Sequence, residues 1–120
     1  MGHLIIAAAM KVHTALGPGL LENVYEPCLA HELTKHGVPA RRQVSVAMRY
    51  DDLAVENAYR IDLLVADRVV VEVKSLELIL AVHRGQHLSY LRLGKFKLGY
   101  LLDFNVAHMR EGITRMVNGL

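Results

Sequence analysis

The stretch that decides the fold reads YRIDLLVADRVVVEVK, from Tyr59 to Lys74. It predicts two apolar strands joined by a tight loop of Ala66, Asp67 and Arg68. Strands that are apolar on both faces belong in the middle of a sheet, where charged side chains are rare. The charged residues inside both strands therefore call for an explanation other than exposure to solvent.

The alternation of a pleated strand places these charges on defined faces. Residues two apart share a face, so Glu72 and Lys74 of the second strand point the same way. On the first strand the same rule predicts Arg60, Asp62 and Leu64 on one face, and Ile61, Leu63 and Val65 on the other.

The tight loop predicts how the two strands meet. If they pair about Asp67, Asp62 lies directly across from Glu72, with Cβ atoms roughly 5 Å apart. Two carboxylates at that distance repel unless a cation lies between them or one is protonated. A hard divalent ion such as Mg²⁺ takes carboxylate oxygens and keeps water, and Lys74 beside it would orient or deprotonate that water. The simpler alternative is an exposed hairpin with a Glu72–Lys74 ion pair, worth less than about 1 kcal/mol.

Length and composition describe an ordinary globular chain. The 120 residues are 52% hydrophobic and 22% charged, which excludes disorder and predicts one domain over residues 1–120. The net charge of +2 does not by itself identify a nucleic-acid partner. The single cysteine, Cys28, excludes an intrachain disulfide and favours a cytoplasmic protein. Neither a signal peptide nor a membrane span is expected, because no apolar run approaches about 18 residues.

Hydrophobic periodicity predicts an α/β fold. The order is helix, helix, three strands, helix, strand and tail. The strand after the third helix is expected to return parallel to the strand that carries Glu72. Pro27 should kink the second helix. The predicted helices are Leu4–Leu16, Leu20–His36 and His83–Leu93; strands outside the quoted stretch are Gln43–Tyr50, Lys97–Phe104 and a short one near Ile113–Val117.

Three further groups are candidates for the site. Gln86 and Tyr90 lie four apart on the third helix and so share a face, where they can hold a phosphate or simply pack. His83 and His87 have the same spacing, and without a third ligand they are expected to be a solvated pair. Glu22 is either a first-turn residue stabilised by the helix dipole or a third carboxylate for the metal.

Several of these residues carry a resemblance to a known family. The segment GLLENVY, from Gly19 to Tyr25, resembles the signature of the GxxExxY protein family. The likeness runs over almost the whole chain, and this family is grouped with the PD-(D/E)XK, or restriction-endonuclease-like, nuclease superfamily. Its other matching blocks are Val12-His13, Asp62 with Glu72-Val73-Lys74, Gln86 with Ser89-Tyr90-Leu91, and Leu98 to Asn105.

The resemblance implies a restriction-endonuclease-like core, a mixed sheet of about four to five strands flanked by helices. It also implies a phosphodiesterase site that uses Mg²⁺ or Mn²⁺. By this likeness Asp62, Glu72 and Glu22 would be metal ligands, and Lys74 would help to activate water. Gln86 and Tyr90 resemble a Gln-x-x-x-Tyr element of related nucleases. Such relatives often add a helical histidine as a ligand, for which His13 is the candidate, although a lone helical histidine is more often structural.

Two functions follow for the chain. The first is a divalent-metal-dependent nuclease that acts on nucleic acid, most readily DNA. The second is a catalytically inactive module that binds nucleic acid or protein on the same scaffold. A homodimer is expected by resemblance alone. Loss of cleavage or retention of DNA affinity in Asp62→Ala would separate the two functions.

Overall fold

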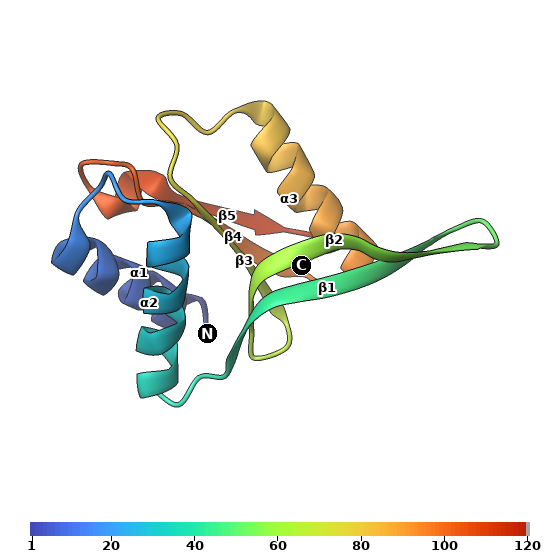
Figure 1. Ribbon diagram of the computed structural model, residues 1–120, viewed down its shortest axis with the longest axis horizontal. Helices are drawn as coiled ribbons and strands as arrows, with labels where there is room; N and C mark the ends of the chain where they lie inside the picture. Colours follow the sequence, from blue (N-terminus) through green and yellow to red (C-terminus); the bar gives the residue numbers. More distant parts are fainter. Residues whose placement is uncertain (120) are drawn as a thin grey trace.

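One five-stranded mixed sheet separates two helices on one face from a third helix on the other (Figure 1). The computed structural model describes residues 1–119. Within that range no helix is both long and apolar enough to cross a membrane. In chain order the elements are α1 (Gly2–Leu16), α2 (Glu22–Lys35), β1 (Ala40–Tyr50), β2 (Leu53–Val65), β3 (Val69–Lys74), α3 (Ala81–Gly94), β4 (Leu98–Asp103), the 3-10 helix η1 (Met109–Gly112) and β5 (Ile113–Val117).

The sheet has the predicted mixed topology. Its strands lie in the order β1-β2-β3-β4-β5, so the strand that carries Glu72 is central. Only β3 and β4 are parallel, from Val69↔Leu98 to Lys74↔Asp103, and α3 forms the crossover between them. The tight turn is confirmed as well, since Val65 pairs with Val69. This is the α/β architecture of a restriction-endonuclease-like fold.

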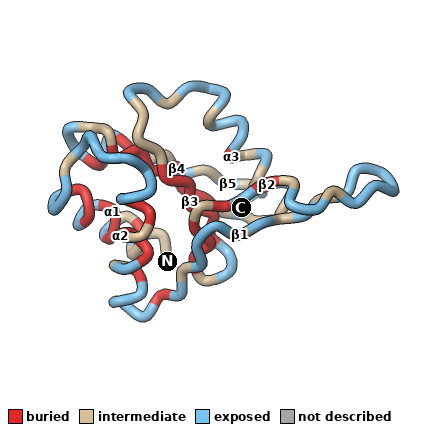
Figure 2. The backbone as a smooth tube through the Cα atoms, viewed as in Figure 1, coloured by how far each residue is buried: buried red, intermediate tan, exposed pale blue. Residues whose placement is uncertain are grey.

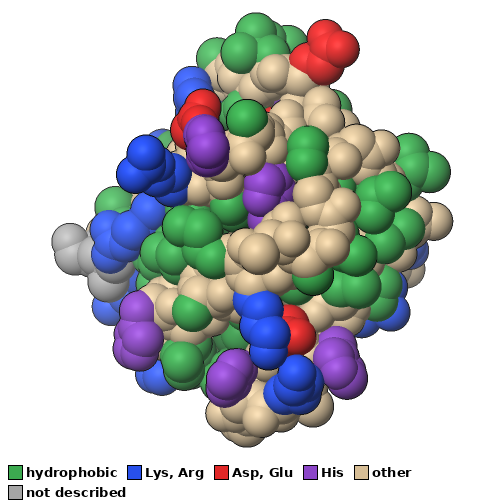
Figure 3. All heavy atoms as spheres, turned by 90° about the vertical axis from the view of Figure 1, so that its left-hand side faces the viewer, with side chains coloured by type: hydrophobic (Ala, Val, Ile, Leu, Met, Phe, Trp, Pro, Cys, Tyr) green, Lys and Arg blue, Asp and Glu red, His purple; other side chains and the backbone are tan. Residues whose placement is uncertain are grey.

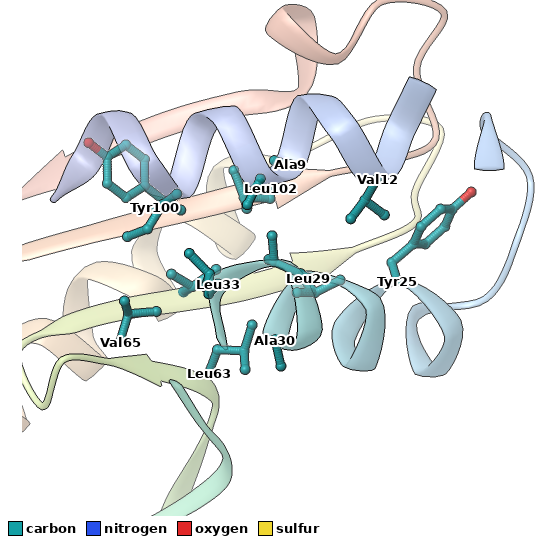
Figure 4. Packing of buried hydrophobic residues seen from close by; sticks show 14 of the residues in the cluster. Ala9, Val12, Tyr25, Leu29, Ala30, Leu33, Leu63, Val65, Tyr100 and Leu102 are labelled. Carbon is teal, nitrogen blue, oxygen red and sulfur yellow. The ribbon is translucent and has the colours of Figure 1, made fainter. Parts of the chain in front are cut away.

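Two apolar clusters hold the layers together. The larger lies between the sheet and the pair α1 and α2, where Ala9, Val12, Leu29 and Leu33 face the strands (Figure 4). The smaller lies beneath α3 and centres on Leu91. Buried backbone is concentrated where β3 and β4 run through the middle of the sheet (Figure 2). Burial of both faces explains why the central strands are so apolar.

The β1–β2 hairpin is longer than predicted. Beyond the body of the sheet it continues as a two-stranded arm (Figure 1), which ends at the pair Tyr50↔Leu53 around Asp51 and Asp52. β1 begins at Ala40 rather than at Gln43, where the strand was predicted to start. The β1 half of the arm was predicted as far as Tyr50, but the β2 half, residues 53–58, was missed because it is mostly exposed and lacks a clear apolar alternation.

The buried face of α2 differs from the prediction. The apolar spacing predicts Leu21, Val24, Cys28, Leu29 and Leu33 on the buried side. Leu29 and Leu33 are buried, but Leu21 and Val24 are 72% and 37% exposed, and Tyr25 and Glu26 are buried as well. The helix is turned so that the Tyr25 ring enters the core and stacks on Phe104 at a centroid distance of 4.5 Å. The helical assignment continues across Pro27. A large aromatic ring thus outweighed the aliphatic residues on which the prediction relied.

Tyr25 also fixes the loop between α1 and α2. Its hydroxyl donates to the Gly17 carbonyl at 2.6 Å and accepts the Leu20 amide at 3.1 Å. Gly19 lies between these two points with a φ of 99°, a conformation that glycine adopts without strain. The signature around Gly19 and Tyr25 is therefore a loop clamp that sets where α2 begins.

We expect Tyr25→Phe to lower the free energy of unfolding by about 1–2 kcal/mol, because both loop hydrogen bonds are lost while the ring still packs. Urea denaturation measures this. Tyr50→Phe is the matched control and should leave stability unchanged, since Tyr50 is 72% exposed. Equal stability of the two variants would contradict the clamp.

Candidate functional site

The site begins where the pairing of β2 and β3 ends. The last paired residues are Leu63 and Val71, so the next position in register would place Asp62 opposite Glu72, as predicted. The backbone ladder does not include that pair. Instead the Val73 amide donates to Oδ2 of Asp62 at 2.8 Å. The carboxylate of Asp62 thus replaces a backbone acceptor beside Glu72.

The faces predicted for β2 agree with the packing from Leu63 to Val65 and are wrong at Ile61, before Asp62. Ile61 and Leu64 both pack beneath α3, whereas Leu63 and Val65 pack beneath α1 and α2. Regular alternation would have placed Ile61 with Leu63. The pleat is therefore interrupted at Asp62.

The neighbouring strand contains the matching interruption. Gln43 of β1 has a φ of 54°, in the left-handed region, and the ladder resumes on either side of it. The flanking pairs Arg42↔Leu63 and Val44↔Ile61 place Gln43 opposite Asp62. Two facing residues thus leave the ladder together, and both strands change face at that point.

Glu72 is the most perturbed group of the site. Its side chain is 5% exposed, and Oε1 has no hydrogen-bond partner among the described residues. Burial, then the Asp62 charge and a hydrogen bond with Asp62, together raise the pKa of Glu72 to about 9. At neutral pH the free protein therefore carries a proton on Glu72, beside Asp62.

Lys74 lies two residues after Glu72 and is half-buried. Since Val69, Val71 and Val73 pack toward α1 and α2, alternation points Glu72 and Lys74 toward α3. The Lys74 charge partly opposes the rise in the pKa of Glu72. The prediction that these two residues share a face therefore agrees with the packing of β3.

The third helix contributes the predicted glutamine and tyrosine. Burial raises the pKa of Tyr90, and the charges of Glu72 and Asp62 raise it further, while a hydrogen bond with Gln86 lowers it. The phenol therefore lies near the acidic pair. The Tyr90 ring stacks on Tyr59 at 4.4 Å, and the Tyr59 hydroxyl donates to the Tyr90 carbonyl at 3.1 Å. These contacts anchor this part of α3 over the site.

The solvated histidine pair predicted on α3 is wrong. His87 is 1% exposed and packs over Gly99, and both of its ring nitrogens lack partners among residues 1–119. Burial lowers the pKa of His87 to about 4, with a further contribution from Lys74. His83 instead accepts the Leu80 amide through Nδ1 at 2.9 Å. His87 lies four residues before buried Leu91, a spacing that could have indicated its burial.

Glu22 and His13 do not join the acidic pair. Glu22 is exposed at the start of α2. His13 is buried, and its Nε2 lies 2.8 Å from the Val106 carbonyl, which ties α1 to the segment after β4. Residues 1–119 contain no group of three His, Cys, Asp or Glu side chains that could hold a metal. The role predicted for Glu22 as a third ligand stays a prediction.

Glu26, which sequence analysis overlooked, lies on α2 one turn after Glu22. It is 6% exposed, and its charge contributes to the raised pKa of Glu72. Its Oε2 accepts from Nε and Nη2 of Arg42 at 3.1 and 2.9 Å, and its Oε1 accepts from Nε2 of Gln43 at 2.6 Å. The i, i+4 spacing from Glu22 was the available signal.

Asp103 forms hydrogen bonds with the segments that follow β3 and β4. This side chain is 3% exposed, and its Oδ1 accepts the amides of Leu76 and Asn105, each at 3.0 Å. The Phe104 amide donates to the Lys74 carbonyl at 2.9 Å. An aspartate at this position therefore ties the end of β3 to the end of β4.

The acidic pair fits a divalent cation. Asp62 leaves Oδ1 free of the bond to Val73, and Glu72 has an oxygen without a hydrogen-bond partner. Buried carboxyl oxygens without partners are costly unless a proton or a cation satisfies them. The Glu72 oxygen is of this kind, and together with the neighbouring Asp62 carboxylate and a lysine it provides the oxygen ligands that Mg²⁺ and Mn²⁺ prefer.

A mixed α/β sheet with Asp62, Glu72 and Lys74 on its inner strands defines a restriction-endonuclease-like protein. A sequence model of the PD-(D/E)XK nuclease superfamily matches residues 1–116, and the chain belongs to that superfamily. No curated protein and no solved structure shows a significant match to it. The finer likeness to the GxxExxY family stays a prediction.

We expect the metal-free protein to lose stability as pH rises from about 5 to 9. The folded-state pKa of Glu72, about 9, exceeds its ordinary value of 4.5, so the folded state binds the extra proton between these values. The slope is at most about 1.4 kcal/mol per pH unit. Urea denaturation with a chelator present, repeated across this pH range, measures it.

Glu72→Gln should flatten that slope, because glutamine does not titrate. Glu77→Gln is the control, since Glu77 is exposed and should leave the slope as in the wild type. A slope that persists unchanged in Glu72→Gln would show that another group causes the pH dependence.

Proposed function

We propose that this protein is a divalent-metal-dependent nuclease that hydrolyses phosphodiester bonds in DNA, with Mg²⁺ or Mn²⁺. One observation carries the proposal. Glu72 is buried with an unsatisfied oxygen beside Asp62, and Lys74 follows on the same strand. The cost of burying such a carboxyl group is hard to explain by folding alone, and perturbed groups of this kind concentrate at functional sites.

Each residue has a role in this proposal. Asp62 and Glu72 would hold the metal ion, and Glu72 would do so as the carboxylate. A bound divalent ion would polarise the phosphoryl oxygen and lower the pKa of water. Lys74 orients the attacking water and offsets charge on the scissile phosphate. Gln86 and Tyr90 donate hydrogen bonds that position the phosphate over the acidic pair.

The surface charge of the face that carries α1 and α2 favours contact with a polyanion. On the face that carries α1, α2 and the loop between them, Lys, Arg and His side chains recur and acidic side chains are few (Figure 3). The chain as a whole carries a formal net charge of +2. Local positive potential of this kind favours contact with a phosphate backbone.

We expect the wild-type protein to cut DNA in the presence of Mn²⁺ or Mg²⁺. Asp62→Asn and Lys74→Gln should each lower the rate by about a hundredfold or more, because they remove a metal ligand and the group that orients water. A gel assay with labelled DNA measures this. Lys97→Gln is the control, since Lys97 is an exposed lysine before β4.

A wild-type protein that binds DNA without cutting it would support the alternative, an inactive binding module. In that case Asp62→Asn should keep the affinity for DNA, because the carboxylate would serve no turnover.

A separate prediction concerns Glu22. We expect Glu22→Gln to weaken Mn²⁺ binding less than Asp62→Asn does, because Glu22 is exposed and lies outside the acidic pair. Isothermal titration calorimetry with Mn²⁺ compares the two variants. A larger loss in Glu22→Gln would establish Glu22 as a principal ligand and show that α2 moves toward the pair when metal binds.

A further inference from the structure

We propose that Glu26 is a positioning residue for Asp62 and acts through Gln43. The three residues come from three elements, α2, β1 and β2, and they meet where both strands change face. The inference rests on the proposed function only in assigning Asp62 to metal binding. The position of the Asp62 carboxylate is a property of the metal-free protein.

The first step is the contact of Glu26 with β1. Both of its carboxylate oxygens are engaged, Oε2 by two nitrogens of Arg42 and Oε1 by Nε2 of Gln43. Glu26 is 6% exposed, so these charge-assisted bonds form largely out of water. A buried glutamate with both oxygens occupied makes a rigid attachment point on α2.

The second step is the conformation of β1. Successive strand residues normally point to opposite faces, yet the side chains of Arg42 and Gln43 both reach Glu26. The left-handed φ of 54° at Gln43 makes this possible. That conformation is unfavourable for a residue with a Cβ. The bond to Glu26 compensates for it.

The third step leads from Gln43 to the site. The flanking register places Gln43 opposite Asp62, and both residues leave the regular ladder. The interruption frees Asp62 from ordinary alternation, so that its carboxylate can accept the Val73 amide at 2.8 Å. Glu26 therefore holds Gln43 in its left-handed conformation. That conformation goes with the change of side-chain faces in β2, which orients the Asp62 carboxylate toward the Val73 amide.

The bond between Asp62 and Val73 provides a readout that needs neither metal nor activity. Hydrogen exchange of the Val73 amide reports whether Asp62 keeps its place. The Phe104 amide is the internal reference, because it donates to the carbonyl of Lys74, the residue that follows Val73 in β3. A general loss of stability lowers protection at both amides, whereas a misplaced Asp62 lowers it only at Val73.

We expect Glu26→Gln to lower protection at Val73, relative to Phe104, by about tenfold, which corresponds to the loss of one hydrogen bond. Arg42→Gln should act in the same direction. Arg41→Gln is the matched control, because Arg41 is the adjacent arginine but pairs with exposed Asp67 in the turn. It should leave the ratio of the two protections unchanged.

Two substitutions of Gln43 test the backbone directly. Gln43→Val disfavours a positive φ because valine is β-branched, and it should lower the ratio as Glu26→Gln does. Gln43→Gly loses the side chain but accepts a positive φ, so it should keep the Val73 protection. This pair also carries the test if Glu26→Gln does not fold. Unchanged ratios in Glu26→Gln and Gln43→Val would overturn the proposal.

The proposed function can fail independently of this inference. Calorimetry with Mn²⁺ and a DNA cleavage assay of the wild type test the function alone. Where the wild type binds Mn²⁺, Glu26→Gln and Gln43→Val should weaken that binding, while Arg41→Gln and Gln43→Gly should not. Normal Mn²⁺ affinity in both of the first two variants would show that Glu26 does not position Asp62 for the metal.

Discussion

The hydrogen bond from the Val73 amide to Asp62 is the interaction around which this structure is arranged. It stands where the backbone pairing of β2 and β3 ends, and a carboxylate takes the place of a carbonyl. A backbone amide buried between strands must find an acceptor, so the requirement is strict. Meeting it with Asp62 brings a negative charge beside Glu72, and the electrostatics of the site follow from that placement.

This placement explains why helices on both faces of the sheet contribute to one site. On one side, α2 holds β1 through Glu26, and on the other, α3 presents Gln86 and Tyr90. In a regular sheet the two faces are separated by the backbone, and their side chains do not meet. The reversal at Gln43 and Asp62 removes that separation locally. The loss of regular pairing is thus the condition for assembling the site.

Much of this could be predicted from sequence, and the rest depended on tertiary contacts. The register between β2 and β3 could be predicted from their apolar sequences and the short turn between them, because those signals are local. The reversal of faces could not be read, since a left-handed Gln43 has no sequence signature and is held by Glu26 on another element. Glu26 itself was overlooked because its partners, Arg42 and Gln43, lie on another element.

Several buried groups of the site lower the stability of the folded protein. Among residues 1–119, Glu72 is buried with an oxygen that has no hydrogen-bond partner, and both ring nitrogens of His87 also lack partners. Buried polar groups without partners usually lower the free energy of unfolding relative to apolar residues of the same size. The two apolar clusters and the Tyr25 clamp supply stability elsewhere. Protonated Glu72 favours folding, whereas ionised Glu72 favours a bound cation. A rise in pH should therefore strengthen cation binding and lower the stability of the metal-free protein.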